Sequence, residues 1–347
     1  MMSGKLEVLV LKNKSGAEAS FSNYGARWLS FIVPGKNGCL VDVVLGFDVP
    51  GNYAVAEERY HGAVIGRVAG RIKNGIVNIG DKTCQLSINE VLPGAATNHL
   101  HGGEDGLSFC FWESRKLKDE RDQEAVTFSY NSPCGEGGYI GNLAIQVTYT
   151  LTEENAVIIQ YSATADQPTP VSLSNHAYFN LSGTKEPTIL NHSLQISARK
   201  FLEFDRETFC VTGKILPVAK TPMDFLLPKK IGADINRKHN QLIDDRGYNV
   251  YYVLDESIGV ADAVLESPVS GLRLEIFTTE PGVQLYCAGY WNGKDLGKNN
   301  QWYQKYGGIA LEPHRYPYCI ENPGFPSIIL SPEEKYNQVT TYRISNL

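Results

Sequence analysis

The chain has 347 residues, of which 42% are hydrophobic, and it carries 32 Lys and Arg against 38 Asp and Glu, a formal net charge of −6. This mildly acidic balance argues against a nucleic-acid-binding protein, which usually shows a basic stripe. No run approaches the roughly 18 consecutive apolar residues of a transmembrane helix, so we expect a globular chain without membrane spans.

The predicted elements are strands almost throughout. The first residues, MMSGKLEVLVLKNKSG, give a short apolar run that suits a first strand better than a signal peptide. Alternating apolar residues over 143–151 and 157–163 predict a hairpin around Glu153–Asn155. Helical periodicity is scarce, and residues 224–242 are the best candidates for a few helical turns. Alternation over 272–276 and 283–287, separated by Pro281–Gly282, predicts a second hairpin.

Many strands without intervening helices predict an all-β fold, with antiparallel sheets packed as a sandwich and few short helices. No composition break divides the chain, so residues 1–347 are expected to form one domain. The seven cysteines are scattered, odd in number and contain no CxxC pair, which favours reduced thiols and a cytoplasmic protein over disulfides or a zinc site.

Four polar clusters stand in strand-like or glycine-rich segments. In residues 66–72, GRVAGRI, either a turn with solvated arginines or an arginine that grips a polar ligand fits the pattern. In residues 98–103, NHLHGG, alternation places His99 and His101 on one side of a strand, as a structural pair or as ligand contacts. No further metal ligands stand at a suitable spacing, so no metal is expected.

The third cluster, residues 172–180, places Ser174, His176, Tyr178 and Asn180 on one face of a strand, which favours a ligand-binding cleft. In the fourth, residues 307–315, an apolar strand ends in the carboxylate of Glu312, which in isolation could simply face water. Motifs for nucleotide cofactors, metal hydrolysis and serine nucleophiles are missing, so no cofactor is expected. Acid–base chemistry by His and Glu remains.

These clusters, in this order, resemble those of the aldose 1-epimerase (galactose mutarotase) family. The resemblance runs nearly end to end through LGFD at 45–48, GRVAGRI at 66–72, NHLHGG at 98–103, SPCGEGGY at 132–139, SNHAYFNLSG at 174–183, PGVQLY at 281–286, Leu311–Glu312 and NPGFP at 322–326. The family fold is a large antiparallel β-sandwich, the galactose mutarotase-like supersandwich, which agrees with the strand pattern.

The resemblance also implies a site. Glu312 falls on the family's general base and His176 on its general acid. The positions that contact sugar in the family are occupied here by Gly70, Arg71, His101, Tyr178, Asn249 and Gln284. The chain departs from the family in four segments: Asn249 replaces an Asp that binds sugar, Pro313–His314 replaces Thr-Gln, Pro317–Cys319 replaces Pro-Asp-Ala, and Pro332–Glu334 replaces Pro-Gly-Glu.

The implied activity is cofactor-free interconversion of the α and β anomers of a free aldohexose, galactose or glucose. Two alternatives stay open: a hexose-6-phosphate 1-epimerase, which needs an additional cationic cluster, and a catalytically silent sugar-binding protein of the same fold. The expected partner is therefore a small sugar rather than nucleic acid or a membrane, and nothing in the sequence indicates an oligomeric state.

Overall fold

A computed structural model describes residues 4–36, 38–243, 246–256, 259–318, 322 and 324–347. The expected strand-rich fold is confirmed: within these ranges the strands form seven sheets, and all named strands pair antiparallel. Helical structure in the described residues consists of five short 3₁₀ helices: η1 (Pro50–Ala54), η2 (Leu107–Phe109), η3 (Glu136–Gly138), η4 (Ile231–Ala233) and η5 (Lys298–Asn300). None of the described helices is long and apolar enough to cross a membrane.

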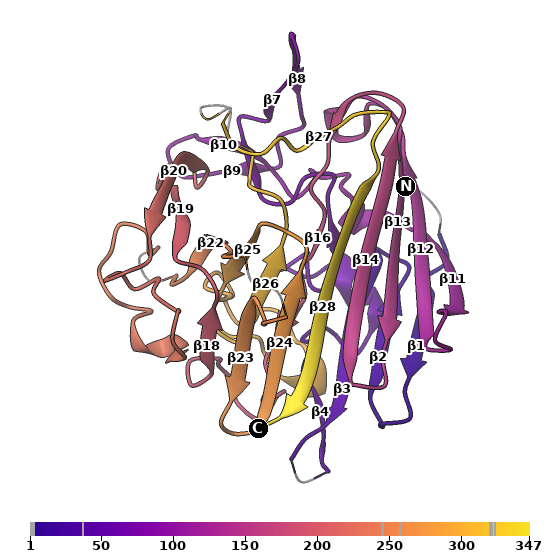
Figure 1. Ribbon diagram of the computed structural model, residues 1–347, viewed down its shortest axis with the longest axis vertical. Helices are drawn as coiled ribbons and strands as arrows, with labels where there is room; N and C mark the ends of the chain where they lie inside the picture. Colours follow the sequence, from indigo (N-terminus) through magenta and orange to yellow (C-terminus); the bar gives the residue numbers. More distant parts are fainter. Residues whose placement is uncertain (1–3, 37, 244–245, 257–258, 319–321, 323) are drawn as a thin grey trace.

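The largest sheet among the described residues has nine strands, and Figure 1 shows the strands from β11 to β18 side by side. In spatial order they are β11 (Glu113–Lys118), β12 (Glu124–Ser132), β13 (Leu143–Leu151), β14 (Ala156–Ala165), β28 (Tyr336–Asn346), β24 (Leu272–Thr278), β23 (Ala263–Ser267), β18 (Ser193–Ile196) and β21 (Lys229–Lys230). The predicted hairpin is confirmed as β13–β14, and Asn155, with φ 56°, closes its turn because Asn tolerates the left-handed conformation.

Two further sheets pack against the nine-stranded sheet. The six-stranded sheet contains, in spatial order, β17 (Tyr178–Phe179), β26 (Ile309–Pro313), β25 (Gly282–Tyr286), β22 (Asn249–Val253), β19 (Lys200–Phe204) and β20 (Val211–Pro217). The four-stranded sheet contains β1 (Val8–Lys12), β2 (Glu18–Ser22), β3 (Arg27–Pro34) and β4 (Leu40–Asp42), so the predicted first strand is present.

Contacts between layers define the sandwich. The hydroxyl of Tyr342 on β28 donates to the carbonyl of Leu311 on β26 at 3.1 Å. The rings of Phe21 on β2 and Tyr149 on β13 lie 4.5 Å apart between centroids. One buried hydrophobic cluster contains side chains from all three sheets. Burial of these apolar inner faces stabilises the packing of the sheets.

Four small sheets complete the described part of the fold. They are formed by β6 (Arg71–Lys73), β10 (Thr97–Leu100) and β9 (Glu90–Val91) together; by β5 (Val64–Ile65) with β16 (Ser174–Asn175); by β7 (Ile76–Ile79) with β8 (Lys82–Gln85); and by β15 (Thr169–Pro170) with β27 (Ile329–Leu330).

Two expectations are corrected. The second predicted hairpin is wrong, because β24 pairs with β23 and β28 while β25 pairs with β22 and β26. Residues 279–281 carry the chain from one layer of the sandwich to the other and do not form a hairpin turn. The helical turns expected over residues 224–242 are limited to η4, which has three residues.

Candidate active site

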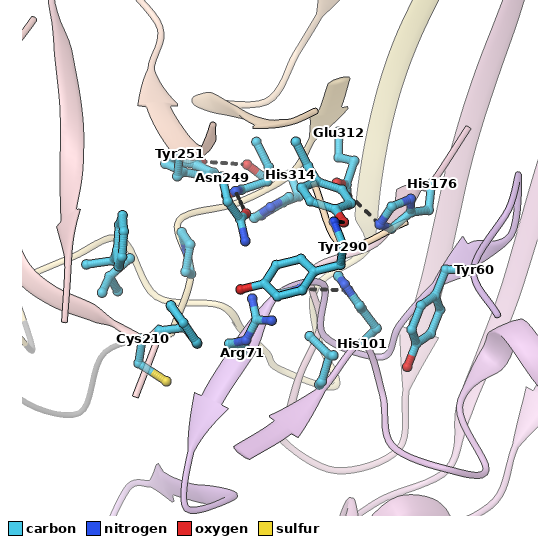
Figure 2. Close-up of a pocket in the computed structure, with 18 of the residues that line it drawn as sticks. Tyr60, Arg71, His101, His176, Cys210, Asn249, Tyr251, Tyr290, Glu312 and His314 are labelled. Atoms are coloured by element: carbon cyan, nitrogen blue, oxygen red, sulfur yellow. Dashed lines mark hydrogen bonds and ion pairs between the residues drawn. The ribbon is translucent and has the colours of Figure 1, made fainter. Parts of the chain in front are cut away.

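A cavity of about 270 Å³ opens beside the six-stranded sheet, and all eight site residues expected from the sequence line it. β26, β25 and β22 supply Glu312, Gln284 and Asn249, while β6 and the end of β10 supply Arg71 and His101 from the opposite side (Figure 2). Their roles in binding and catalysis stay predictions.

Glu312 and His176 form a buried pair. Glu312 is 2% exposed in β26, whose five residues are all buried, and His176 is 4% exposed between β16 and β17. Oε1 of Glu312 lies 3.5 Å from Nε2 of His176, the contact drawn as a dashed line in Figure 2. The other polar atoms of these two side chains, Oε2 and Nδ1, are buried without a hydrogen-bond partner among the described residues. Buried polar atoms are nearly always paired, so these two indicate that a polar ligand belongs here.

Burial also sets the protonation of this pair. Burial raises the pKa of the Glu312 carboxyl to about 8, with a smaller contribution from the negative charge of Glu58. Burial lowers the pKa of the His176 imidazole to about 3. In the sugar-free protein at neutral pH the pair therefore holds one proton, on Glu312, and behaves as a coupled unit.

His101 is oriented as a hydrogen-bond donor. It follows β10 with φ 50°, and its Nδ1 accepts a hydrogen bond of 3.2 Å from the backbone N–H of Gly70. Burial lowers the pKa of His101 well below its ordinary value, so the ring is neutral and its Nε2 carries the hydrogen. Gly70 thus reaches the site through its backbone, where a φ of 79° suits glycine.

His99 does not share this face, contrary to the sequence expectation. Its two ring nitrogens lie 2.6 Å from the carbonyl of Ser87 and 2.7 Å from the hydroxyl of Tyr139, and the residue is fully buried. The positive φ of His101 interrupts the alternation on which the prediction depended.

Three potential metal ligands do come together. Ligand atoms of His101, His176 and Glu312 lie within 4.8 Å of one another, a grouping that sequence spacing did not reveal. The hydrogen bond from Gly70 opposes metal binding at His101: Nδ1 already faces an N–H donor, and Nε2 carries a hydrogen. The absence of a metal requirement remains a prediction.

The two arginines of the GRVAGRI segment have different environments. Arg71 makes a two-pronged ion pair with Glu90, at 2.8 Å from Nε and 2.7 Å from Nη2, and still lines the cavity. Arg67 is 2% exposed and donates to the carbonyls of Ser132 and Gly141, so it holds loops together. Of the two interpretations, the ligand-facing one suits Arg71 alone.

Asn249 and Gln284 form a linked pair on one wall of the cavity. Nε2 of Gln284 donates to Oδ1 of Asn249 at 2.6 Å. Asn249 therefore presents its NH₂ group to the cavity, and Gln284 keeps its carbonyl oxygen as an acceptor. Asp244 and Asp245, the two rival candidates that the sequence offers for the contact expected of Asn249, lie outside the described residues, as does Cys319 in the third departure.

The third cluster is not one continuous strand. β16 and β17 have two residues each and belong to different sheets. Ser174 and Asn180 donate to the backbone carbonyls of Pro313 and Gly307, so these two side chains serve packing. Of the expected row, His176 and Tyr178 alone line the cavity.

The cavity lining also includes polar residues to which the sequence analysis assigned no role, among them Glu58, Tyr60 and His314. His314 occupies one of the positions at which the chain departs from the family, and its ring is 1% exposed. Nδ1 of His314 lies 2.6 Å from the carbonyl of Arg315, so Nδ1 carries the hydrogen and Nε2 is an acceptor. Burial lowers the pKa of His314 to about 4, which keeps it neutral.

Glu58 and Tyr60 stand in an irregular segment that Arg27 holds in place. The buried guanidinium of Arg27 donates to the carbonyls of Arg59 at 2.9 Å and His61 at 2.8 Å. The ring of Tyr60 lies 4.8 Å from that of His101 and 5.9 Å from that of His176, between centroids. No strand pattern marks this segment, so periodicity could not have found it.

Comparisons with known proteins identify the family of this chain and agree with its fold. The family model described as aldose 1-epimerase matches residues 7–343. The chain is 37% identical to galactose mutarotase of Rattus norvegicus over 324 residues, which cover 93% of this chain and 90% of that protein. It is 32% identical to aldose 1-epimerase of Escherichia coli K12, over 97% of this chain and 94% of that protein. The structure of an aldose epimerase homologue from C. elegans superimposes with a TM-score of 0.87 at 31% identity, covering 99% of this chain and 100% of that one. The chain belongs to the aldose 1-epimerase family.

Proposed function

We propose that this protein interconverts the α and β anomers of free aldohexoses, galactose and glucose, in the cytoplasm, as one β domain without a cofactor. The observation that carries the proposal is the buried Glu312–His176 pair at 3.5 Å, in a cavity lined by neutral and charged hydrogen-bonding groups. General acid and base catalysis each contribute roughly 10²–10⁴-fold when the groups are positioned on the reacting atoms.

Glu312 and His176 together supply and take up every proton that the reaction needs. In the reactive form the shared proton has moved from Glu312 to His176, across the 3.5 Å between Oε1 and Nε2. The Glu312 carboxylate then takes the proton of the C1 hydroxyl while His176 gives its proton to the ring oxygen, and the C1–O5 bond breaks to give the open-chain aldehyde. Rotation about C1–C2 presents the other carbonyl face, and the reverse transfers close the other anomer.

The surrounding groups position the sugar. The Nε2–H of His101 and the guanidinium of Arg71 donate to sugar oxygens, and the amide oxygen of Gln284 accepts from a hydroxyl. Holding the ring in this way keeps C1 and the ring oxygen against the catalytic pair.

A phosphorylated hexose fits the cavity less well than a free one. Among the described residues that line the cavity, the cationic side chains are Arg59 and Arg71. Each lies 2.7 Å from a carboxylate oxygen, of Glu104 and Glu90 respectively. Carboxylates on the same lining repel a phosphate dianion, so a sugar without phosphate is the better substrate.

Polarimetry on freshly dissolved α-D-galactose, α-D-glucose and a hexose 6-phosphate tests the proposal. The purified protein is expected to accelerate mutarotation of the two free sugars. Acceleration of the phosphate alone would favour the phosphate epimerase, and binding of free sugar without acceleration would favour a silent sugar-binding protein.

A further inference from the structure

Glu58 contributes a second carboxylate to the cavity. Among the described lining residues the carboxylates belong to Glu57, Glu58 and Glu312. Glu312 belongs to the acid–base pair, and the exposed Glu57 lies 3.3 Å from Nζ of Lys294. Glu58 is therefore the carboxylate that remains to accept a hydrogen bond from a bound sugar.

The Glu58 side chain is held rigidly from both ends. Its backbone N–H donates to Oδ2 of Asp295 at 2.9 Å, and its Oε1 accepts from the backbone N–H of Tyr60 at 3.1 Å. Its Oε2 accepts from the hydroxyl of Tyr178 at 2.8 Å. Each carboxylate oxygen has capacity for a further hydrogen bond, and a carboxylate fixed in this way loses little entropy when it binds a hydroxyl.

This arrangement changes the part that Tyr178 plays. Tyr178 is 0% exposed, and the one hydroxyl proton it has is donated to Glu58. Tyr178 is thus a positioning residue, and the group that meets the sugar on this wall is the half-buried Glu58.

The carboxylate of the family pattern is missing at position 249. Asn249 stands where the family pattern has Asp, and with its Oδ1 engaged by Gln284 it presents a donor. We propose that Glu58, rather than the residue at position 249, supplies the charged acceptor for a sugar hydroxyl in this cavity, and that this contact sets sugar preference. This inference rests on the proposed function, since it names a contact to the sugar in that site.

The test compares wild type with Glu58→Gln, which keeps the shape and removes the charge. A hydrogen bond to a charged acceptor is stronger than one to a neutral acceptor. Glu58→Gln is therefore expected to raise KM for galactose or glucose roughly tenfold. The rate constant kcat should change far less than KM. Glu113→Gln, an exposed carboxylate on β11, is the control for loss of charge and should leave both constants unchanged.

Deoxy sugars separate a contact from a structural effect. For the 2-, 3-, 4- and 6-deoxy hexoses, the Glu58→Gln penalty should disappear for the sugar that lacks the hydroxyl bound by Glu58, and persist for the others. A penalty of equal size on every deoxy sugar, or no penalty on any sugar with an active wild type, overturns the proposal. If Glu58→Gln fails to fold, Glu58→Asp replaces it in the test. Asp keeps the charge, but its shorter side chain moves the carboxylate oxygens away from the sugar. KM should then rise for every sugar except the one that lacks the hydroxyl bound by Glu58.

Failure of the proposed function gives a different result. A wild type that accelerates no mutarotation would refute the epimerase, and calorimetric titration of galactose into wild type and Glu58→Gln would then decide the contact. A roughly tenfold weaker Kd in the variant supports it, whereas equal Kd values, or no binding to wild type, overturn it.

Discussion

Replacing Glu312 by Gln should stabilise the protein while removing its activity. The variant keeps the size of a side chain that is 2% exposed, so it leaves no cavity. Burial raises the pKa of this carboxyl from 4.5 to about 8, so the folded state holds its proton at a pH where the unfolded state has released it. This difference destabilises the wild-type fold progressively as pH rises through 4.5, and it stops growing above pH 8.

The magnitude follows from the linkage of protonation to folding. Each pH unit between the two pKa values costs the wild type about 1.36 kcal/mol, which gives about 3 kcal/mol at pH 7 and less than about 1 kcal/mol at pH 5. Glu312→Gln does not titrate and escapes this cost. Urea denaturation at pH 5 and pH 7, with the slope checked for equality, measures the difference. In parallel, kcat should fall by roughly 10²–10⁴-fold.

The exposed Glu333 supplies the control, since Glu333→Gln should alter stability little at either pH. A Glu312→Gln variant that is no more stable than wild type at pH 7, or whose advantage is the same at both pH values, would refute the reasoning. Either result would mean that Glu312 is ionised in the fold, paired with a protonated His176.

Three other predictions concern the same cavity. His176→Asn should lower kcat by roughly 10²–10⁴-fold with sugar binding largely retained, and near-normal turnover in steady-state kinetics would remove His176 from the acid role. Asn249→Asp restores an acceptor beside Gln284 and should lower KM for galactose and glucose by roughly tenfold, whereas an unchanged KM would place the sugar elsewhere. Exhaustive chelation should leave polarimetric activity intact, because the hydrogen bond from Gly70 opposes a metal on His101; activity lost on chelation and regained with one added metal would contradict this.

Sequence patterns predicted which segments are strands better than they predicted which strands pair with one another. Alternation marked β13, β14, β24 and β25 correctly as strands, because side-chain burial alternates along most of β13, β14 and β24 and the apolar residues of β25 are buried. It could not assign β24 and β25 to different sheets, since the same alternation suits a hairpin turn and a crossing between layers. Pairing depends on contacts between residues far apart in the sequence, which a local pattern does not contain.

In the site, too, the local sequence marked some residues and not others. An apolar strand led to Glu312, but only the family resemblance separated a catalytic carboxylate from one that faces water. The NHLHGG cluster led to both His99 and His101, and only the resemblance chose His101, because its positive φ breaks the alternation. Glu58 carried no signal of either kind: it enters the cavity from an irregular segment, and what makes it notable is the hydroxyl of Tyr178, which lies 120 positions away in the sequence.

Arg27 fixes the segment from Arg59 to His61 by hydrogen bonds to backbone carbonyls, which every amino acid supplies. Side chains of residues 57–60 can therefore be exchanged without loss of the hydrogen bonds from Arg27. In contrast, all five residues of β26 are buried, so this strand tolerates little change. Evolution, or a protein engineer, can accordingly alter which sugar is accepted through residues 57–60 while the proton-transfer machinery on β26 stays as it is. Libraries confined to this wall, rather than to the sheet, are where new sugar specificities should arise.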